Sequence, residues 1–380
     1  MNKKYHIPCM IMRGGTSKGV FFMENDLPAD KEERDRILLK IMGSPDAKQL
    51  NGLGGAASVT SKAAIVSVSQ REDADVDYTF AQISVDKPIV SYKGNCGNIL
   101  SAVGPFAIER GLVKVKEPLT TVRIYNTNTG KIMESEVTVE NGSVKYDGDY
   151  SIAGVTGSGA PIRLSFLNPA GTLSKGLLPT GNVTDELEVS GLSRKVMVSI
   201  VDAANPLVFV KAEDLGVDLL ASPKTWDCDE AMLTMLEAVR GAAAVKLGLI
   251  DDCHVSAWMS PGIPKLAIVG PARDYATTGN EIIKSGQIDF LSRMMSMQKT
   301  HPSYAMTGAM CTAAAAVAEG SVVWQIMRKN ADRQQIRIGH PAGILDAGVN
   351  YSKENGEIRI QNTFGFRTAN LLMEGNVYCC

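Results

Sequence analysis

Apolar residues recur at helical spacing in two segments of the chain, residues 30–43 and residues 228–248. Both segments carry Asp or Glu in the first turn and Lys or Arg near the last turn, as the helix dipole favours. Short runs rich in Val, Ile and Tyr, such as residues 75–85 and 121–126, predict β-strands. Since both halves of the chain combine such strands with helices, the pattern predicts an α/β protein.

Two further segments predict where a helix and a hairpin begin and end. Residues 97–111 (GNILSAVGPFAIERG) predict a helix with Asn98 as its N-cap, a bend at Pro105 and an end at Gly111. Residues 12–22 (MRGGTSKGVFF) predict a strand, a glycine turn and a second strand. They lack the G-x-x-x-x-G-K-[ST] spacing of a phosphate-binding loop, so a hairpin turn is the simpler interpretation.

The two halves of the chain share four similar segments in the same order, which indicates an internal duplication. The pairs are VFFMENDLP and VFVKAEDLG, KAAIV and KLAIV, FAIERGLV and AVAEGSVV, and RIYNTNTG and RIGHPAG. A segment rich in Gly, Pro, Ser and Thr separates the copies. We therefore predict an N-terminal domain over residues 1–183 and a C-terminal domain over residues 184–380, with a ligand in the cleft between them.

Composition and charge narrow the possible partners. The 380 residues are 44% hydrophobic, and 39 basic and 41 acidic residues are scattered along the chain, which argues against nucleic acid or an anionic membrane as partner. No window reaches the roughly 18 to 20 apolar residues of a membrane span, and the N-terminus lacks a secretory signal. We therefore expect a cytoplasmic protein. The seven cysteines form no C-x-x-C pair and the four histidines stand far apart, so no disulfide framework or metal site is predicted.

Cys96 lies at the predicted start of the helix over residues 97–111. A thiol there is near the positive end of the helix dipole, which favours its thiolate form. Free N–H groups of the same helix end can bind a carboxylate. Gly94 and Gly97 on either side allow a ligand to approach the backbone closely. These residues alone leave two interpretations of Cys96 open, a reactive thiol and a buried packing thiol.

The second copy of the duplication carries Ala305 at the position that matches Cys96. The repeat has therefore lost its thiol. Thr307 and Gly308 still mark the start of a helix, which can bind a carboxylate but cannot move a proton. Cys311 lies further along the same Ala-rich helix, where we expect it to pack in the core.

A few other polar side chains are candidates for the same site. Lys62 begins the apolar strand KAAIV, where a desolvated amine could act as acid or base; a lysine at a surface strand edge is the alternative. Ser17 lies in the predicted hairpin, and Ser260 lies on a turn just before Lys265, the repeat of Lys62. His301 just precedes the second helix start, where it would either contact a ligand or have a structural role.

Several motifs together resemble the PrpF-type isomerases over nearly the whole chain. They are MRGGTSKGVFF, GLGGAASVTSKAAIV, GNCGNILSAVGPFAIE, LLPTGNVTDEL, DAANPLVFV and MTGAMCTAAAA. That family contains 2-methylaconitate isomerase, oxalomesaconate tautomerase and 3-methylitaconate Δ-isomerase, and the chain is most similar to the last in length and motifs. The resemblance implies the diaminopimelate epimerase fold, with two similar α/β domains around a central cleft. It also implies catalysis without a cofactor, and a homo-oligomer, either a dimer or a tetramer.

The resemblance also implies roles for particular residues. Cys96 and Lys62 match the proposed catalytic pair of the family, and Ser17 and His301 are similar to family residues that line the substrate pocket. The other expected substrate-binding residues come from the sequence itself: Gly97, Asn98, Thr307 and Gly308 at the two helix starts, and Ser260 on its turn. Related epimerases use one thiol from each half, which Ala305 rules out here. One thiol and one amine suit a double-bond shift in a small unsaturated di- or tricarboxylic acid. The resemblance implies conversion of (R)-3-methylitaconate to 2,3-dimethylmaleate. The alternatives are 2-methylaconitate isomerisation, 4-oxalomesaconate tautomerisation, and non-catalytic binding of a carboxylic acid.

Overall fold

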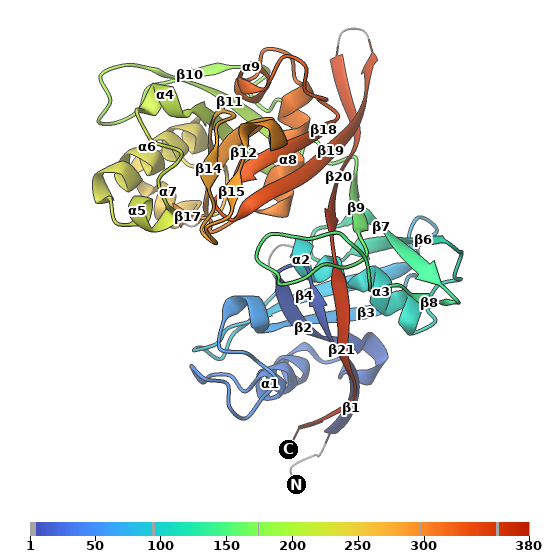
Figure 1. The fold of residues 1–380 in the computed structure, drawn as a ribbon. Helices are drawn as coiled ribbons and strands as arrows, with labels where there is room; N and C mark the ends of the chain where they lie inside the picture. The colour runs from blue at the N-terminus through green and yellow to red at the C-terminus, as the bar shows by residue number, and fades with distance from the viewer. Residues whose placement is uncertain (1–4, 93–95, 174, 297, 355–356, 380) are drawn as a thin grey trace. The chain divides into compact units, whose positions relative to one another are not determined.

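The structure is a computed structural model that describes residues 5–92, 96–173, 175–296, 298–354 and 357–379. Gly94 lies outside these described residues. The chain divides into two compact units (Figure 1): unit 1 contains Met1–Leu167 and Phe366–Cys380, and unit 2 contains Asn168–Gly365. Within the described ranges, no helix is both long and apolar enough to cross a membrane.

The first boundary, after Leu167, lies earlier in the chain than the predicted boundary at residues 183/184. The reason is that the segment following Leu167 hydrogen-bonds into unit 2. The Asp202 carboxylate accepts the N–H of Leu173 at 2.7 Å, and the Asp202 N–H donates to the carbonyl of Leu177 at 2.8 Å. The C-terminal segment returns to unit 1, where β21 (Ala369–Cys379) pairs with β1 (Tyr5–Gly14). No local sequence similarity indicated that the C-terminal segment pairs with β1.

Unit 1 is a mixed β-sheet with helices against it. Its main strands run across the sheet in the order β21, β1, β2, β3, β4, β6, β7 and β9. Their bounds are β2 Ser17–Met23, β3 Lys62–Val68, β4 Val76–Ile83, β6 Leu119–Asn126, β7 Lys131–Glu140 and β9 Ile162–Leu167, with the short strands β5 Val90–Ser91 and β8 Ser143–Val144. The helices are α1 Lys31–Met42, α2 Gly97–Leu100 and α3 Val103–Glu109. The pairs β2/β3 and β4/β6 are parallel, and the other neighbours are antiparallel.

Unit 2 repeats this strand order. Its main strands follow as β10, β11, β12, β13, β16, β18, β19 and β20, with β12/β13 and β16/β18 parallel. Their bounds are β10 Asp185–Leu187, β11 Val196–Ala203, β12 Asn205–Lys211, β13 Lys265–Pro271, β16 Phe290–Ser296, β18 Gln335–His340, β19 Gly343–Glu354 and β20 Glu357–Arg367, with the short strands β14 Tyr275–Ala276, β15 Ile282–Ile283 and β17 Lys299–Thr300. The helices are α4 Ala212–Leu215, α5 Pro223–Asp227, α6 Glu230–Lys246, α7 Ser256–Met259, α8 Met306–Val317 and α9 Val322–Ile326.

The pairing registers agree with the duplication seen in the sequence. In unit 1, Val20 of β2 lies opposite Ala63 of β3, and in unit 2, Val208 of β12 lies opposite Leu266 of β13. These are the positions that the similar segments VFF/VFV and KAAIV/KLAIV place together. Topology and register therefore support two copies of one α/β unit.

An ion pair is also duplicated. Arg123 pairs with Asp75 at 2.7 Å in unit 1, and Arg337 pairs with Asp289 at 2.8 Å in unit 2. In each case the aspartate also accepts the N–H of its arginine, at 2.8 Å and 2.7 Å respectively. Each aspartate precedes one strand of a parallel pair and each arginine lies on the other strand, so the bonds hold the strands together.

We expect Asp75→Ala to lower the free energy of unfolding at pH 7 by about 1–3 kcal/mol, because it removes hydrogen bonds to a charged group. Burial alone would raise the pKa of the Asp75 carboxyl, but hydrogen bonds from Arg123 outweigh burial and lower that pKa. Because the pKa of this carboxyl is lower in the folded than in the unfolded protein, the carboxylate stabilises the fold at pH values above its unfolded-state pKa, about 4. This stabilisation is lost as the pH falls through the folded-state pKa. Urea unfolding should therefore show the full difference in unfolding free energy between the parent protein and Asp75→Ala at pH 7, and a smaller difference below about pH 4.

A matched control for Asp75→Ala is available in the same turn. Asp73 forms its ion pair with Arg71 on the surface, with both side chains about half exposed, and such pairs contribute little to stability. Asp73→Ala should leave the free energy of unfolding nearly unchanged. An Asp75 variant that is equally destabilised at pH 7 and pH 3 would contradict the electrostatic explanation.

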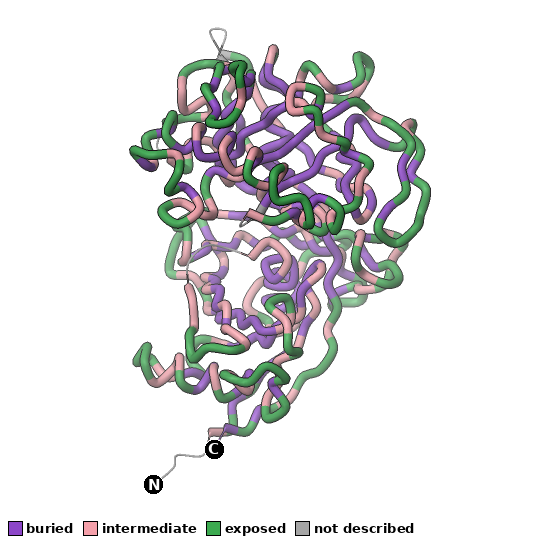
Figure 2. The backbone as a smooth tube through the Cα atoms, turned by 90° about the vertical axis from the view of Figure 1, so that its left-hand side faces the viewer, coloured by how far each residue is buried: buried purple, intermediate pink, exposed green. Residues whose placement is uncertain are grey.

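The predicted amphipathic helices are confirmed as α1 and α6. Asp30 caps α1 by accepting the N–H of Glu33 at 2.8 Å, and α1 ends at Gly43, whose φ of 75° is left-handed. Asp229 caps α6 by accepting the N–H of Met232 at 2.9 Å. Figure 2 shows that buried residues lie mainly in the interior and exposed residues mainly in the outer parts of the tube.

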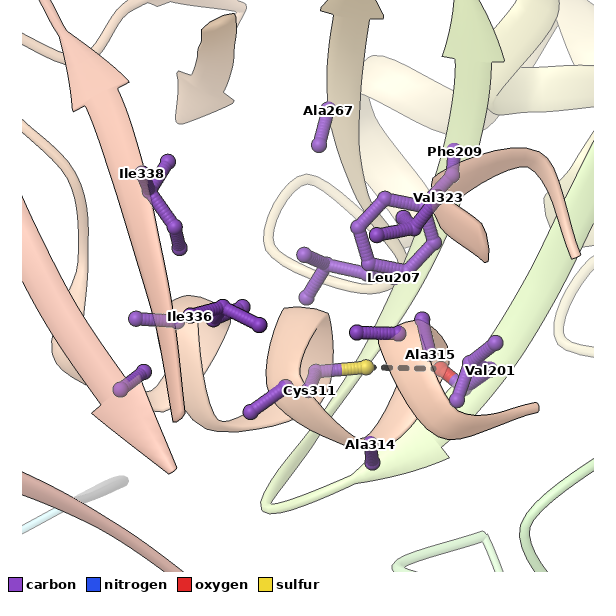
Figure 3. Packing of buried hydrophobic residues seen from close by; sticks show 14 of the residues in the cluster. Val201, Leu207, Phe209, Ala267, Cys311, Ala314, Ala315, Val323, Ile336 and Ile338 are labelled. Carbon is purple, nitrogen blue, oxygen red and sulfur yellow. Dashed lines mark hydrogen bonds between the residues drawn. The ribbon is translucent and has the colours of Figure 1, made fainter. Parts of the chain in front are cut away.

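Helix α8 is the core helix of unit 2. It packs against β11, β12, β18 and β19, and nearly every residue from Gly308 to Val317 is buried (Figure 3). A helix buried on all sides is apolar all round, and its many alanines let the strands approach closely. The Cys311 thiol donates to the carbonyl of Val201 at 3.2 Å, and burial raises the pKa of that thiol. The predicted packing role of Cys311 is confirmed.

Candidate active site

Cys96 is the N-cap residue of α2 and is half-buried. Its carbonyl accepts the N–H of Leu100 at 2.9 Å, while its side chain makes no capping hydrogen bond. The prediction that Asn98 caps this helix was wrong. Asn98 lies inside the first turn, and its Nδ2 donates to Thr16 Oγ1 at 2.9 Å because Thr16 lies directly beside it. The Cys96 thiol therefore lies at the helix start without capping the helix.

The helix predicted over residues 97–111 is interrupted. It consists of α2 (Gly97–Leu100) and α3 (Val103–Glu109), separated at Ser101 and Ala102. Pro105 has no N–H to donate to the carbonyl of Ser101, so a continuous helix would lose a bond there. As the third residue of α3, Pro105 takes a position whose N–H has no partner within the helix. The predicted bend at Pro105 is in fact a break.

The hairpin turn between β1 and β2 packs directly on the start of α2. A Cβ atom on Gly14 would lie 2.3 Å from the Asn98 carbonyl oxygen, and one on Gly15 would lie 2.2 Å from Asn98 Oδ1. Gly15 also has a φ of 51°, which a glycine adopts at little cost. The two glycines therefore bring Thr16 and the buried Ser17 against the turn that carries Cys96.

Lys62 begins β3 and is 7% exposed. Its Nζ donates to Gln82 Oε1 and lies 5.1 Å from the centre of the Phe80 ring. The Gln82 Nε2 donates to the carbonyls of Ser61 and Ser58, at 2.9 Å and 3.1 Å, which orients its Oε1 toward Lys62. The alternative of a lysine at a surface strand edge is therefore wrong for Lys62.

Lys62 and Cys96 lie on the same face of the unit 1 sheet. Tyr78, Phe80 and Gln82 alternate along β4 and so share one face, and Lys62 shares it because it lies opposite Gln82. A Cβ on Gly104 of α3, the helix that follows α2, would lie 2.5 Å from Ser135 Oγ of β7, and the β4/β6/β7 register places Ser135 on the face of Tyr78. Burial, and then the charge of Cys96, raise the pKa of the Tyr78 phenol. Among the described residues, the Tyr78 hydroxyl has no hydrogen-bond partner.

Three residues of this cluster were not predicted from the sequence. Gln82 and Tyr78 could have been found only from the β3/β4 register, which places them on the face of Lys62. Arg367 enters from the C-terminal return of the chain, and its Nε lies 3.4 Å from Asn98 Oδ1. No local sequence signal connects it to Cys96.

Unit 2 carries the remaining predicted site residues. Ala305 is the N-cap of α8, as Cys96 is the N-cap of α2, so the predicted equivalence of these positions is confirmed. Thr307 and Gly308 are the second and third residues of α8. The Nδ1 of His301 accepts the N–H of Ser303 at 3.1 Å. This bond puts the proton of the neutral ring on Nε2.

Ser260 directly follows α7 as its C-cap residue, and its hydroxyl donates to the carbonyl of Ile263 in the same turn. Its own carbonyl accepts from Arg240 Nη1 at 2.6 Å. Both polar groups of Ser260 therefore help to hold the turn before Lys265. Each unit thus holds part of the predicted site: the thiol, the amine and Ser17 in unit 1, and His301, Ser260 and the α8 start in unit 2.

The chain is similar to known proteins over nearly its whole length. The family model described as "PrpF protein" matches residues 4–380. The chain is 45% identical to the 3-methylitaconate isomerase of Eubacterium barkeri, over 100% of this chain and 98% of that protein. A crystal structure of methylitaconate-delta-isomerase superposes with a TM-score of 0.90 at 44% identity, covering 99% of this chain and 96% of that one.

A more distant structural match concerns the fold alone. A hydroxyproline epimerase from Agrobacterium vitis superposes with a TM-score of 0.54 at 12% identity, covering 100% of this chain and 92% of that one. The expected diaminopimelate epimerase-like fold of two similar α/β units is confirmed. With a family model that spans nearly the whole chain and a full-length relative at 45% identity, the chain belongs to the PrpF family of isomerases.

Proposed function

We propose that this protein shifts a C=C double bond in a small unsaturated carboxylic acid, converting (R)-3-methylitaconate to 2,3-dimethylmaleate. The observation that carries the proposal is the full-length similarity to a 3-methylitaconate isomerase, at 45% identity. The arrangement of unit 1 supports it, because one thiol and one amine lie on the same face of a single sheet.

The reaction moves one proton between two carbons. The C–H of 3-methylitaconate that lies beside a carboxylate is also allylic, so removal of its proton gives a dienolate spread over that carboxylate. Return of a proton to the terminal methylene carbon completes the shift and forms a methyl group. Cys96 and Lys62 carry the two transfers, each as general acid or base. The chain's own groups suffice for this chemistry, so we propose no cofactor.

The second unit does not contribute a thiol at the matching position. Ala305 caps α8 where Cys96 caps α2, so a two-thiol epimerisation has no second acid–base group there. The N–H groups of Gly97, Asn98, Thr307 and Gly308 at the two helix starts are proposed to bind carboxylates, together with Ser17 and the Nε2–H of His301. Ser260 is proposed to bind substrate as well, its hydroxyl then donating to a carboxylate in place of the Ile263 carbonyl.

The substrate can be identified by deuterium incorporation. The protein is incubated in D₂O with 3-methylitaconate, 2-methylaconitate and 4-oxalomesaconate in turn, and the products are followed by NMR. We expect rapid label uptake and a new methyl signal only with 3-methylitaconate. Faster conversion of either other acid would assign the corresponding isomerase or tautomerase reaction, and binding without any exchange would identify a non-catalytic binding protein.

We expect Gly14→Ala to reduce turnover by about 100-fold while leaving the protein folded. The new methyl group would lie 2.3 Å from a backbone oxygen of α2, so the start of α2 and its thiol must move, and a shift of about 1 Å can cost that factor. Steady-state rates and circular dichroism check both parts. The control is Gly286→Ala, at an exposed site with no atom within 4 Å of the new Cβ, which should keep normal turnover.

Two further expectations also belong to this proposal. We propose that the enzyme acts in the cytoplasm, as a dimer or tetramer. Light scattering on the purified protein tests the oligomeric state. A monomer at all concentrations would contradict it.

A further inference from the structure

Arg367 is a buried arginine without a carboxylate partner in unit 1. It ends β20, is 6% exposed, and makes no ion pair with any described residue. Its Nη1 donates to the carbonyl of Phe366 at 2.8 Å, and its Nε donates to Asn98 Oδ1 at 3.4 Å. Among the described residues, Nη2 has no hydrogen-bond partner. Burial lowers the pKa of this guanidinium to about 10, so it remains charged at neutral pH.

A buried charge without a counter-charge is costly, and proteins usually pair such groups. The chain follows this rule at Arg240 and Arg163, but not at Arg293 of unit 2, which is 2% exposed and makes no ion pair with a described residue. Arg240, with a side chain only 4% exposed, pairs with Glu237 at 2.5 Å, and the less buried Arg163 pairs with Glu136 at 2.8 Å. Arg367 departs from the rule at the start of α2, next to the cluster that carries Cys96. An anion supplied from outside the chain would complete the missing pair.

The chain holds Arg367 in place through its neighbour Thr368. The Gly15 N–H donates to the Thr368 carbonyl at 2.9 Å, and Arg13 Nη1 donates to the same carbonyl and to Thr368 Oγ1, each at 3.0 Å. A Cβ on Gly15 would lie 3.2 Å from Arg367 Cδ. The hairpin turn that presents Thr16 therefore also fixes the guanidinium beside Asn98.

We propose that Arg367 is a substrate-binding residue, whose guanidinium holds one carboxylate of the unsaturated acid beside Asn98 at the start of α2. The planar guanidinium of arginine binds a carboxylate more specifically than the ammonium of lysine does, because two of its N–H groups can donate to the two carboxylate oxygens at once. This inference rests on the proposed function, since it assigns one of the carboxylates of that substrate. It adds to the helix N–H groups a charged partner that the sequence motifs did not include.

The test compares Arg367→Met with the parent enzyme. We expect the KM for 3-methylitaconate to rise about 10- to 100-fold while kcat changes less than about threefold, because an anchor binds substrate and transition state alike. The inhibition constant of 2,3-dimethylsuccinate, a saturated dicarboxylate that cannot isomerise, should rise by the same factor. The KM of Arg367→Lys should lie between those of the parent enzyme and Arg367→Met, since lysine keeps the charge but cannot form two parallel hydrogen bonds to a carboxylate. Arg110→Met, at an arginine paired with Glu374 on the surface of unit 1, should leave KM unchanged.

A purely structural role for Arg367 would give a different result. Methionine in place of an unpaired buried charge should leave the unfolding temperature of the ligand-free protein unchanged or higher, while the rise in that temperature on adding 2,3-dimethylsuccinate should disappear. An unchanged KM, or a lowered unfolding temperature with the ligand-induced rise retained, would overturn the proposal. If Arg367→Met does not fold, the KM of Arg367→Lys tests the proposal instead. A raised KM supports a substrate-binding role for Arg367, and an unchanged KM overturns it.

The same experiment separates the anchor from the proposed reaction. If the parent enzyme isomerises none of the three candidate acids, the proposed function fails. Calorimetric binding of 2,3-dimethylsuccinate to the parent and to Arg367→Met then still tests the anchor. Binding that requires Arg367 would support a carboxylate site there, and binding of equal strength in both would overturn it.

Discussion

Replacing Cys96 by alanine is expected to lower the turnover of 3-methylitaconate by at least about 100-fold, because general acid–base catalysis contributes about 10² to 10⁴ in rate. The thiol is half-buried at the start of α2 and is not engaged in capping the helix. Its loss should therefore leave the fold intact. Initial rates followed by NMR, with circular dichroism and thermal unfolding on the same samples, measure both effects.

Cys228 provides the matched control. It is an exposed thiol in unit 2, directly after α5, and Cys228→Ala should retain normal turnover. A second variant, Cys96→Ser, keeps a hydrogen-bonding group of similar size but replaces the thiol by a far weaker acid. It should lose most of the activity as well. Near-normal turnover in Cys96→Ala would exclude Cys96 as an acid–base group.

The start of α2 could be predicted because its signals are local and repeated. A Gly-flanked cysteine before an apolar run predicts a helix start, and the matching Ala305 is the N-cap of α8 in the duplicate. The identity of the cap residue was predicted wrongly, as Asn98, because isolated sequence preferences favour Asn at that position. The contact of Asn98 with Thr16, eighty-two residues earlier in the chain, decides its side-chain position.

Local sequence signals could not predict the residues that reach the site through strand pairing or through the return of the C-terminal segment to unit 1. Gln82 meets Lys62 only because β3 and β4 pair with those two residues opposite each other. Arg367 reaches Asn98 only because the chain returns to unit 1 after Gly365. In both cases the relevant partner is distant in sequence, and no spacing rule connects the two. The same return places Phe366–Cys380 in unit 1, whereas the prediction assigned the whole C-terminal half to the second domain.

Lys62→Met is expected to reduce turnover by about 10² to 10⁴, as it removes the second proton-transfer group. The ammonium is buried over Phe80 and its acceptor, Gln82, is a neutral amide, so an unbranched apolar side chain should replace it without unfolding the protein. Lys265→Met is the control, because Lys265 begins β13 as Lys62 begins β3. Normal turnover in Lys62→Met, or an equal loss in Lys265→Met, would contradict the assignment.

The Lys62 and Cys96 variants together assign the direction of proton transfer. In D₂O, the residue that abstracts the proton also exchanges it with solvent, so label enters the C–H position of 3-methylitaconate even when the return step is blocked. If Cys96 abstracts, Lys62→Met should still exchange that hydrogen while forming no 2,3-dimethylmaleate, and Cys96→Ala should do neither. If Lys62 abstracts, the two results are reversed. Exchange lost in both variants would mean that abstraction needs the two groups together, with the amine and the thiol acting as one acid–base unit on the shared face of the unit 1 sheet.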